Sequence, residues 1–349
     1  MTRHKGRGAC DNPPNRFHDQ STEPFDDGWD HDPASRLRTQ VGSDASRNAI
    51  TYNESPDIPF DRSVNPYRGC EHGCIYCYAR PSHAWLDLSP GLDFESRLFV
   101  RHDLARQLYE EFSHASYHAA PLALGTVTDA YQPIEREFRI TRKVLEVLAE
   151  TRHPVVVVTK SALIERDIDL LTELARQQLV EVAVSLTTLQ PALARTMEPR
   201  AAAPARRLRL IRTLSQAGIP VRAMLAPIIP VLNEAEIESL LQAAAAAGAR
   251  AADYVLLRLP LEVAPLFRNW LEQNFPDSAS HVMNHVQQLR GGRDNDPRFG
   301  HRLRGTGVYA DLIGQRFRLA TGKAGLTSRV TLRSDLFRRP DKTGQLALF

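Results

Sequence analysis

Long apolar runs are missing from this 349-residue chain, and the longest candidates are interrupted within about ten residues. A membrane-spanning helix needs about 20 apolar residues, so we expect no membrane span. The first residues, MTRHKGRGACDNPPNR, carry basic groups with no apolar stretch behind them, and we expect no secretory signal there. Both absences favour a cytoplasmic protein, in which thiols stay reduced.

Aliphatic periodicity is nearly absent from residues 1–46, which are rich in Asp, Arg, Pro and Ser. Such a segment cannot bury enough apolar surface to offset the entropy lost on folding, so we expect a disordered leader. The net charge of +3 is unevenly spread. Residues 290–349 hold thirteen Lys or Arg against five Asp or Glu, and we treat residues 276–349 as a basic C-terminal extension.

Strand and helix patterns alternate between these two ends, over residues 47–275. Mostly apolar stretches predict six strands, within residues 63–68, 121–129, 155–160, 180–188, 219–230 and 253–260. Helical patterns cover residues 137–150, 163–178, 206–218, 234–248 and 263–274. Buried strands joined by single helices predict an α/β fold with a parallel sheet, either doubly wound or a partial (β/α)6 barrel of the TIM type. No G-x-G-x-x-G follows the first strand, which removes the main support for a dinucleotide-binding sheet. In either architecture, functional groups gather at the carboxyl ends of the strands.

Cysteine is scarce, yet three of the four cysteines lie within eight residues, directly after the first predicted strand. Their spacing is Cys70-x-x-x-Cys74-x-x-Cys77, and Cys10 lies far upstream. A structural zinc site needs four ligands, with His72 or His83 available as the fourth. A redox C-x-x-C pair leaves Cys70 without a role. A 4Fe–4S cluster held by three thiolates leaves one iron open, which is useful where a cofactor or substrate binds that iron.

The loop resembles the C-x-x-x-C-x-aromatic-C signature of the radical S-adenosylmethionine (SAM) superfamily, with Tyr76 as the aromatic residue. The resemblance covers residues 60 to 275 and implies a partial (β/α)6 barrel, with Cys70, Cys74 and Cys77 holding a 4Fe–4S cluster. It implies that SAM binds the open iron and is cleaved reductively to a 5′-deoxyadenosyl radical, which abstracts hydrogen from a substrate. It also implies an electron donor such as a flavodoxin or a ferredoxin.

Two phrases, NPYRGCEHGCIYCYAR and GTVTDAYQPIE, resemble spore photoproduct lyase and its uncharacterised "DNA repair photolyase"-like relatives. That resemblance implies contacts with SAM from Thr128, Lys160 and Ser185, beside Tyr76 in the cysteine loop. Lyases of this kind repair a crosslinked thymine dimer, and the resemblance implies a cysteine beside the second strand that returns hydrogen to the product. Here the strand reads LALGTVTDAY, without cysteine, which argues against repair by that route.

Other polar residues leave two interpretations open. Asp129 and Glu135 are either polar site groups or charges that favour a helix start. Arg195, Glu198 and Arg200 either line the mouth of the barrel or form surface pairs of little energetic weight.

Arg, Phe, Tyr and Gly alternate in the segment from Arg290 to Gly325. Cations bind phosphates and aromatic rings stack on bases, so this segment contacts nucleic acid or else forms a basic surface that closes the open side of the barrel. The last residues, Gln345–Phe349, read QLALF and are similar to the short peptide that binds the bacterial sliding clamp. The sequence favours a radical SAM enzyme acting on nucleic acid. The alternatives are radical modification of a peptide or small molecule, and a non-catalytic, DNA-associated iron–sulfur or zinc module.

Overall fold

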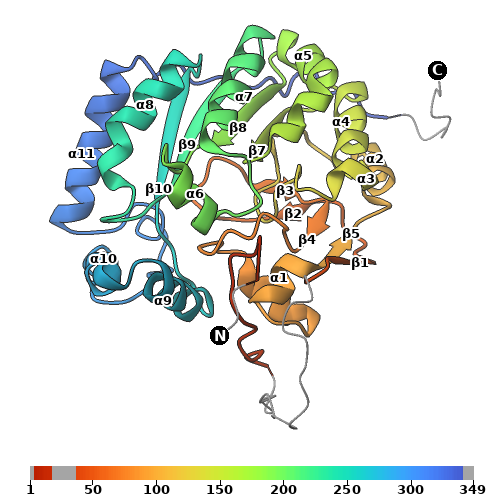
Figure 1. Ribbon diagram of the computed structural model, residues 1–349. Coiled ribbons are helices and arrows are strands. Elements are labelled where there is room, and N and C mark those ends of the chain that lie inside the picture. The colour runs from red at the N-terminus through yellow and green to blue at the C-terminus, as the bar shows by residue number, and fades with distance from the viewer. Residues whose placement is uncertain (1–3, 18–36, 341–349) are drawn as a thin grey trace.

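A single seven-stranded sheet organises the computed structural model, which describes residues 4–17 and 37–340 (Figure 1). Its strand order is β10-β9-β8-β7-β6-β3-β2, and every neighbouring pair from β3 to β10 is parallel. The parallel strands are β3 (Arg62–Val64), β6 (Leu122–Leu124), β7 (Val155–Thr159), β8 (Val180–Ser185), β9 (Val221–Ile228) and β10 (Ala251–Leu256). At the edge, β2 (Thr51–Tyr52) pairs with β3 in the antiparallel sense. Six parallel strands in chain order confirm the partial barrel.

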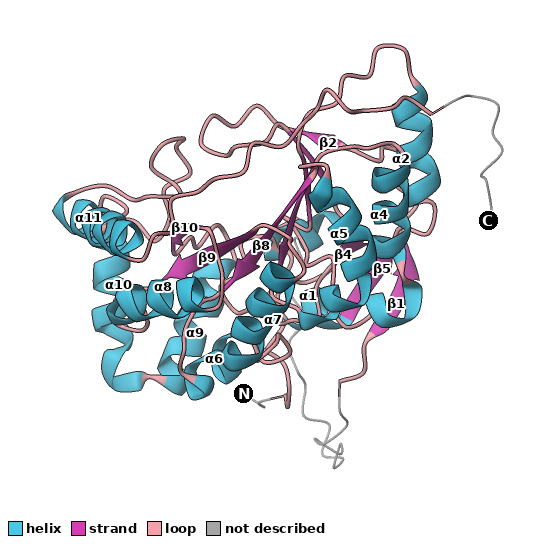
Figure 2. Ribbon diagram, turned by 90° about the horizontal axis from the view of Figure 1, so that it is seen from above, coloured by secondary structure: helices cyan, strands magenta, loops and turns pink. Residues whose placement is uncertain are grey.

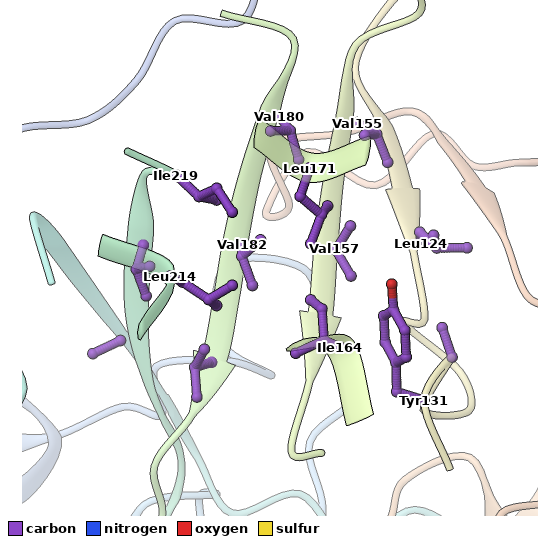
Figure 3. Close-up of a cluster of buried hydrophobic side chains, with 14 of the residues drawn as sticks. Leu124, Tyr131, Val155, Val157, Ile164, Leu171, Val180, Val182, Leu214 and Ile219 are labelled. Carbon is purple, nitrogen blue, oxygen red and sulfur yellow. The ribbon is translucent and has the colours of Figure 1, made fainter. Parts of the chain in front are cut away.

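Helices connect successive strands and cover one side of the sheet (Figure 2). Those that lie between strands are α2 (Leu104–Ser113), α3 (Glu135–Phe138), α4 (Ile140–Glu150), α5 (Ile168–Arg176), α6 (Pro191–Met197), α7 (Pro204–Gln216) and α8 (Ile237–Ala246). Buried side chains of β7 and β8, such as Val157 and Val182, pack against Leu171 of α5 and Leu214 of α7 (Figure 3). β8 is buried at all six positions, which explains its near-continuous apolar sequence.

A second, three-stranded sheet contains two strands, β1 (Gln40–Ser43) and β5 (Arg97–Val100), that the sequence analysis did not predict, and a third, β4 (Tyr67–Arg68), from the end of the stretch predicted as the first strand. β5 pairs in parallel with β1 and antiparallel with β4. It follows a short helix, α1 (Leu92–Ser96). Because β4 runs directly into the cysteines, this small sheet fixes the start of the cysteine loop, defined here as residues 68–81.

The prediction of a disordered leader is wrong for the described part of that segment. Residues 4–17 contact α1 and the cysteine loop, and residues 40–43 form β1. The contacts are mostly polar, so an argument based on apolar burial could not detect them. Residues 18–36 lie outside the described residues.

After β10, the chain forms α9 (Val263–Asn274), α10 (Ala279–Gln288) and α11 (Val308–Lys323). α11 packs on α8 and buries Ile313 and Phe317. The following segment crosses the amino ends of the strands, where Arg333 N donates to Gln178 O and Arg338 N donates to Thr151 O, both before strands β8 and β7. Much of the basic extension is therefore part of the barrel. Among the described residues, none of the helices combines the length and the apolar character that a membrane span requires.

Candidate functional site

The cysteine loop lies at the carboxyl ends of the strands and encloses its thiols. Cys70 and Cys74 are buried, Cys77 is partly buried, and none of the three forms a disulfide. Burial raises the pKa of all three thiols, and for Cys74 it does so to about 12. Asp129 and the other two thiols raise the pKa of Cys70 further, so the three sulfur atoms interact. Without a bound cation the thiols hold their protons at neutral pH, and ligand formation would release those protons.

A fully buried arginine holds the loop from inside. Arg80 Nε donates to Cys74 O at 3.0 Å, and its Nη1 donates to the carbonyls of Pro90 and Gly91. Its Nη2 forms an ion pair with Glu95, whose side chain is also fully buried. Gly69 has a φ of +72°, and a Cβ there would lie 2.6 Å from the Leu98 side chain, so glycine is required at this turn.

The N-terminal segment binds the same carboxylate. The backbone N–H groups of Gly8 and Ala9 each donate to Glu95 at 2.9 Å. A Cβ on Gly8 would lie 1.8 Å from Gly73 O, so the two backbones are in close contact. The premise that Cys10 belongs to a disordered segment is therefore wrong, and its Sγ lies 2.9 Å from Gln273 Oε1 on α9.

A second buried network contacts the loop from the β8 side. The Tyr76 hydroxyl and Thr187 Oγ1 both donate to Glu198, which forms an ion pair with the buried Arg207. Burial alone would raise the pKa of Glu198, but Arg207 and Lys160 lower it to about 2. Glu198 is thus an interior carboxylate that positions Tyr76, and not part of a surface pair.

Arg195 and Arg200, whose position the sequence left open together with that of Glu198, differ from each other in their surroundings. Arg200 pairs with the buried Glu71 of the cysteine loop at 2.9 Å, whereas Arg195 is exposed on α6. Glu135 is buried and accepts hydrogen bonds from the Tyr67 hydroxyl and from Thr141 N, so its role is structural.

Of the four residues predicted to bind SAM, Tyr76 lies in the cysteine loop and Lys160 lies beside it. Lys160 follows β7, and its Nζ lies 5.9 Å from the centre of the Tyr76 ring. Thr128 Oγ1 donates to Tyr67 O at 2.9 Å, and Ser185 Oγ donates to Ala226 O at 3.3 Å. Both hydroxyl oxygens still have acceptor capacity. The geometry brings Lys160, Tyr76 and Cys74 together, and the contacts of all four residues with SAM stay a prediction.

Asp129 connects Lys160 to the cysteine loop. One carboxylate oxygen accepts from Lys160 N at 2.7 Å and lies 3.3 Å from His72 Nδ1, and the other accepts from Thr159 Oγ1 at 2.8 Å. Burial would raise the pKa of Asp129, but His72 and the backbone N–H groups lower it to about 2. Asp129 therefore fixes the end of β7 relative to the loop.

The donor set fits a cluster better than a zinc ion. His72 Nδ1 lies 3.3 Å from a carboxylate oxygen of Asp129, and His83 Nε2 contacts Arg97 O at 2.8 Å. Over residues 4–17 and 37–340, no three His, Cys, Asp or Glu side chains are placed to hold one metal ion. Zinc needs ligands that converge on one point, whereas the thiolates of a 4Fe–4S cluster bind separate irons. Three reduced thiols enclosed by one buried loop match the second arrangement.

Comparison with known proteins agrees with this geometry. The family described as the radical SAM superfamily matches residues 64–244. The chain is 37% identical over 225 residues to an uncharacterised protein of Mycobacterium tuberculosis (strain ATCC 25618 / H37Rv). The aligned residues make up 64% of this chain and 66% of that relative. It is 28% identical over 221 residues to an uncharacterised protein of Methanocaldococcus jannaschii, covering 63% of this chain and 79% of that protein. The chain thus spans just under two thirds of the length of its mycobacterial relatives.

Among solved structures, spore photoproduct lyase complexed with dinucleoside spore photoproduct has a TM-score of 0.57 at 18% identity, over 81% of this chain and 78% of the lyase. A point mutant of spore photoproduct lyase, with tyrosine replaced by phenylalanine, gives 0.58 at 16% identity, over 82% of this chain and 79% of the mutant. At this identity the likeness concerns the fold. Together, the matched segment, the cysteine loop and the partial barrel show that the chain belongs to the radical SAM superfamily, whose cofactors are a 4Fe–4S cluster and SAM.

Proposed function

We propose that this protein is an enzyme that cleaves SAM reductively and abstracts hydrogen from a nucleic-acid substrate. The observation that carries the proposal is the enclosure of three reduced thiols at the carboxyl ends of the strands, with Lys160 beside them. When bound, a three-cysteine 4Fe–4S cluster supplies an open iron for SAM and the electron that cleaves it. Family membership supports the cofactor class, and the substrate is our own inference.

The residues of the chain have distinct proposed tasks. Cys70, Cys74 and Cys77 hold the cluster, and the burial of Cys70 and Cys74 limits the access of water to it. The ammonium of Lys160 binds the carboxylate or ribose of SAM, with Thr128 and Ser185 offering hydroxyl groups nearby.

Two features support a nucleic-acid substrate. The fold is shared with a lyase that was solved with a dinucleoside lesion, and the segment after residue 290 is basic. Part of that basic charge is already paired within the protein, as in the ion pairs of Arg302 with Asp57 and Arg316 with Glu238. The basic C-terminal segment therefore offers less charge to a phosphate backbone than its composition suggests.

The experiment uses anaerobically reconstituted protein with a flavodoxin or ferredoxin as electron donor. We expect a brown protein that forms 5′-deoxyadenosine from SAM and exchanges deuterium between a labelled nucleic-acid pool and the adenosyl carbon. Cys74→Ala should lose cluster and activity, whereas Cys10→Ala is the matched control and should keep both. A colourless protein that binds zinc would favour the non-catalytic module, and deuterium exchange with peptide or small-molecule pools alone would favour those substrates.

A second proposal concerns the final residues. We propose that Gln345–Phe349, which lie outside the described residues, bind the bacterial sliding clamp. In this mode the glutamine bonds at the rim of a pocket while leucine and phenylalanine fill an apolar cleft.

A further inference from the structure

Arg258 is a cation at the barrel mouth that forms no ion pair with any carboxylate of the described residues. It lies two residues after the end of β10, at the carboxyl end of the sheet where the cysteine loop also lies. The guanidinium carbon is 5.2 Å from the centre of the Tyr78 ring, and Tyr78 directly follows Cys77. The Nε atom of Arg258 is shielded from water and has no hydrogen-bond partner. Arg258 therefore contacts the residue next to a predicted cluster ligand.

Other arginines around the mouth are paired, and Arg258 differs from them. Arg302 bonds Asp57 through Nε at 3.0 Å and Nη2 at 2.7 Å. Arg290 donates to four backbone carbonyls, including Leu257 O at 2.6 Å. In the described part of the chain, Arg258 makes no hydrogen bond or ion pair, and its guanidinium lies over the Tyr78 ring.

Asp57 is a carboxylate whose charge acts on Arg258, but other donors already occupy it. Asp57 already accepts from Arg302, from Ser55 Oγ and from Gly300 N at 3.2 Å. Burial and the charge of Arg302 lower the pKa of Arg258, yet a guanidinium remains protonated at neutral pH. A half-buried cation beside a second cation is costly unless an anion neutralises it.

Two half-exposed aromatic rings accompany these cations. Tyr78 is 44% exposed, and Phe299, under the guanidinium of Arg302 at 4.7 Å, is 55% exposed. Cations combined with exposed aromatic rings are typical of surfaces that bind single-stranded nucleic acid, where phosphates meet the charge and bases stack on the rings.

We propose that Arg258 and the adjacent ring of Tyr78 form a subsite for one phosphate of a nucleic-acid strand that enters the barrel mouth. The inference rests on the nucleic-acid substrate proposed above and names the residue that binds its backbone. The carboxylate of SAM is the other anion of suitable chemistry, but Lys160 already provides a cation for it beside Tyr76.

The test measures the affinity of the holoprotein for a fluorescein-labelled single-stranded oligothymidylate by anisotropy under anaerobic conditions. A second probe has the same sequence with neutral methylphosphonate linkages. We expect Arg258→Gln to weaken binding of the phosphodiester probe about tenfold, since one charge-assisted hydrogen-bonding group is lost. Binding of the neutral probe should not change. Arg209→Gln, which removes an exposed charge from the outer helix α7, is the matched control and should bind both probes as wild type.

Three results would overturn the inference: equal phosphodiester affinity in Arg258→Gln and Arg209→Gln, equal weakening for both probes, or a comparable loss of affinity for SAM alone. The last result would assign Arg258 to the SAM carboxylate. Arg258→Lys keeps the charge and should retain part of the difference between probes, which covers the case in which Arg258→Gln does not fold. Formation of 5′-deoxyadenosine by the wild type is measured separately, so a protein that distinguishes the probes but cleaves no SAM would contradict only the proposed enzyme activity.

Discussion

Replacing Glu95 by glutamine tests whether a buried ion pair holds the cysteine loop. Both side chains of the Arg80–Glu95 pair are fully buried, and the carboxylate also accepts the N–H groups of Gly8 and Ala9 at 2.9 Å. Glutamine keeps the size but removes the charge, which leaves the guanidinium of Arg80 uncompensated in the interior. Breaking a buried pair in this way costs about 3–5 kcal/mol. We expect about 3 kcal/mol, because the amide oxygen can still accept one hydrogen bond.

Urea unfolding of the reduced apoprotein measures this loss, and iron content after anaerobic reconstitution measures its consequence for the loop. The control is Glu238→Gln, because Glu238 is 52% exposed and pairs with Arg316 on the surface. Solvent screens that pair, so its loss should cost well under about 1 kcal/mol. If Glu95→Gln were no more destabilising than Glu238→Gln, or bound as much iron as wild type, the loop would not depend on this pair.

Other perturbations address the N-terminal segment, the closure of the barrel and the tail. Gly8→Ala places a methyl group 1.8 Å from a backbone oxygen of the cysteine loop and should lower the iron content, whereas Gly322→Ala meets no atom within 4 Å and should not. Burial alone would raise the pKa of Asp57, but hydrogen bonds from Arg302, Ser55 and Gly300 lower it from 3.8 to about 2. The ionised Asp57 therefore stabilises the folded protein fully above pH 3.8, and this stabilisation is lost as the pH falls toward 2. The stabilities of wild type and Asp57→Asn, followed by acid titration of the apoprotein, should therefore converge over that range, and a constant difference would contradict the assignment. Deleting Gln345–Phe349 should abolish clamp binding measured by calorimetry, and an undiminished affinity would remove that proposal.

The alternating strands and helices were predictable because their buried positions recur regularly along the chain, on one face of each helix and at most positions of each strand. The stretch 155–160 corresponds to β7, and the helix predicted at 263–274 coincides with α9. The strand predicted at 121–129 is much shorter, since β6 ends at Leu124. Gly125 follows with a φ of +85°, and a Cβ there would lie 2.8 Å from Val158 O. The chain turns at this glycine and carries Thr128 and Asp129 into the site instead of extending the strand.

The small sheet and the N-terminal segment were not predictable for the opposite reason. β1 is exposed at all four positions and has no apolar periodicity. Arg7 joins this region to α1 through hydrogen bonds to the backbone oxygen of Glu95 and to Leu37 O. Polar contacts to backbone atoms depend on the final geometry and leave no repeating pattern in the sequence.

Within the site, the spacing of the three cysteines and the family resemblance it carries predicted them as cluster ligands, but no comparable pattern marked the residues that position the loop. Tyr76 and Glu198 are 122 residues apart and meet only because β3 and β8 belong to the same barrel. Arg80 is separated from Glu95 by 15 residues, yet nothing in the sequence distinguishes this pair from the many surface pairs. Charged residues are rarely buried, so an argument from composition assigns them to the surface by default.

The described part of the C-terminal segment ends on the side of the barrel opposite the cysteine loop. Phe337 packs against Phe112, Tyr117 and His153, and Arg339 Nη2 donates to Ala115 O at 2.9 Å, before β6 begins. These contacts lie at the amino ends of the strands, whereas the cysteine loop lies at the carboxyl ends (Figure 1). We therefore expect clamp binding and SAM cleavage to be independent activities. Loss of the tail should then impair recruitment to the clamp without changing the rate at which the purified protein forms 5′-deoxyadenosine, and a parallel loss of both would show that the two ends are coupled.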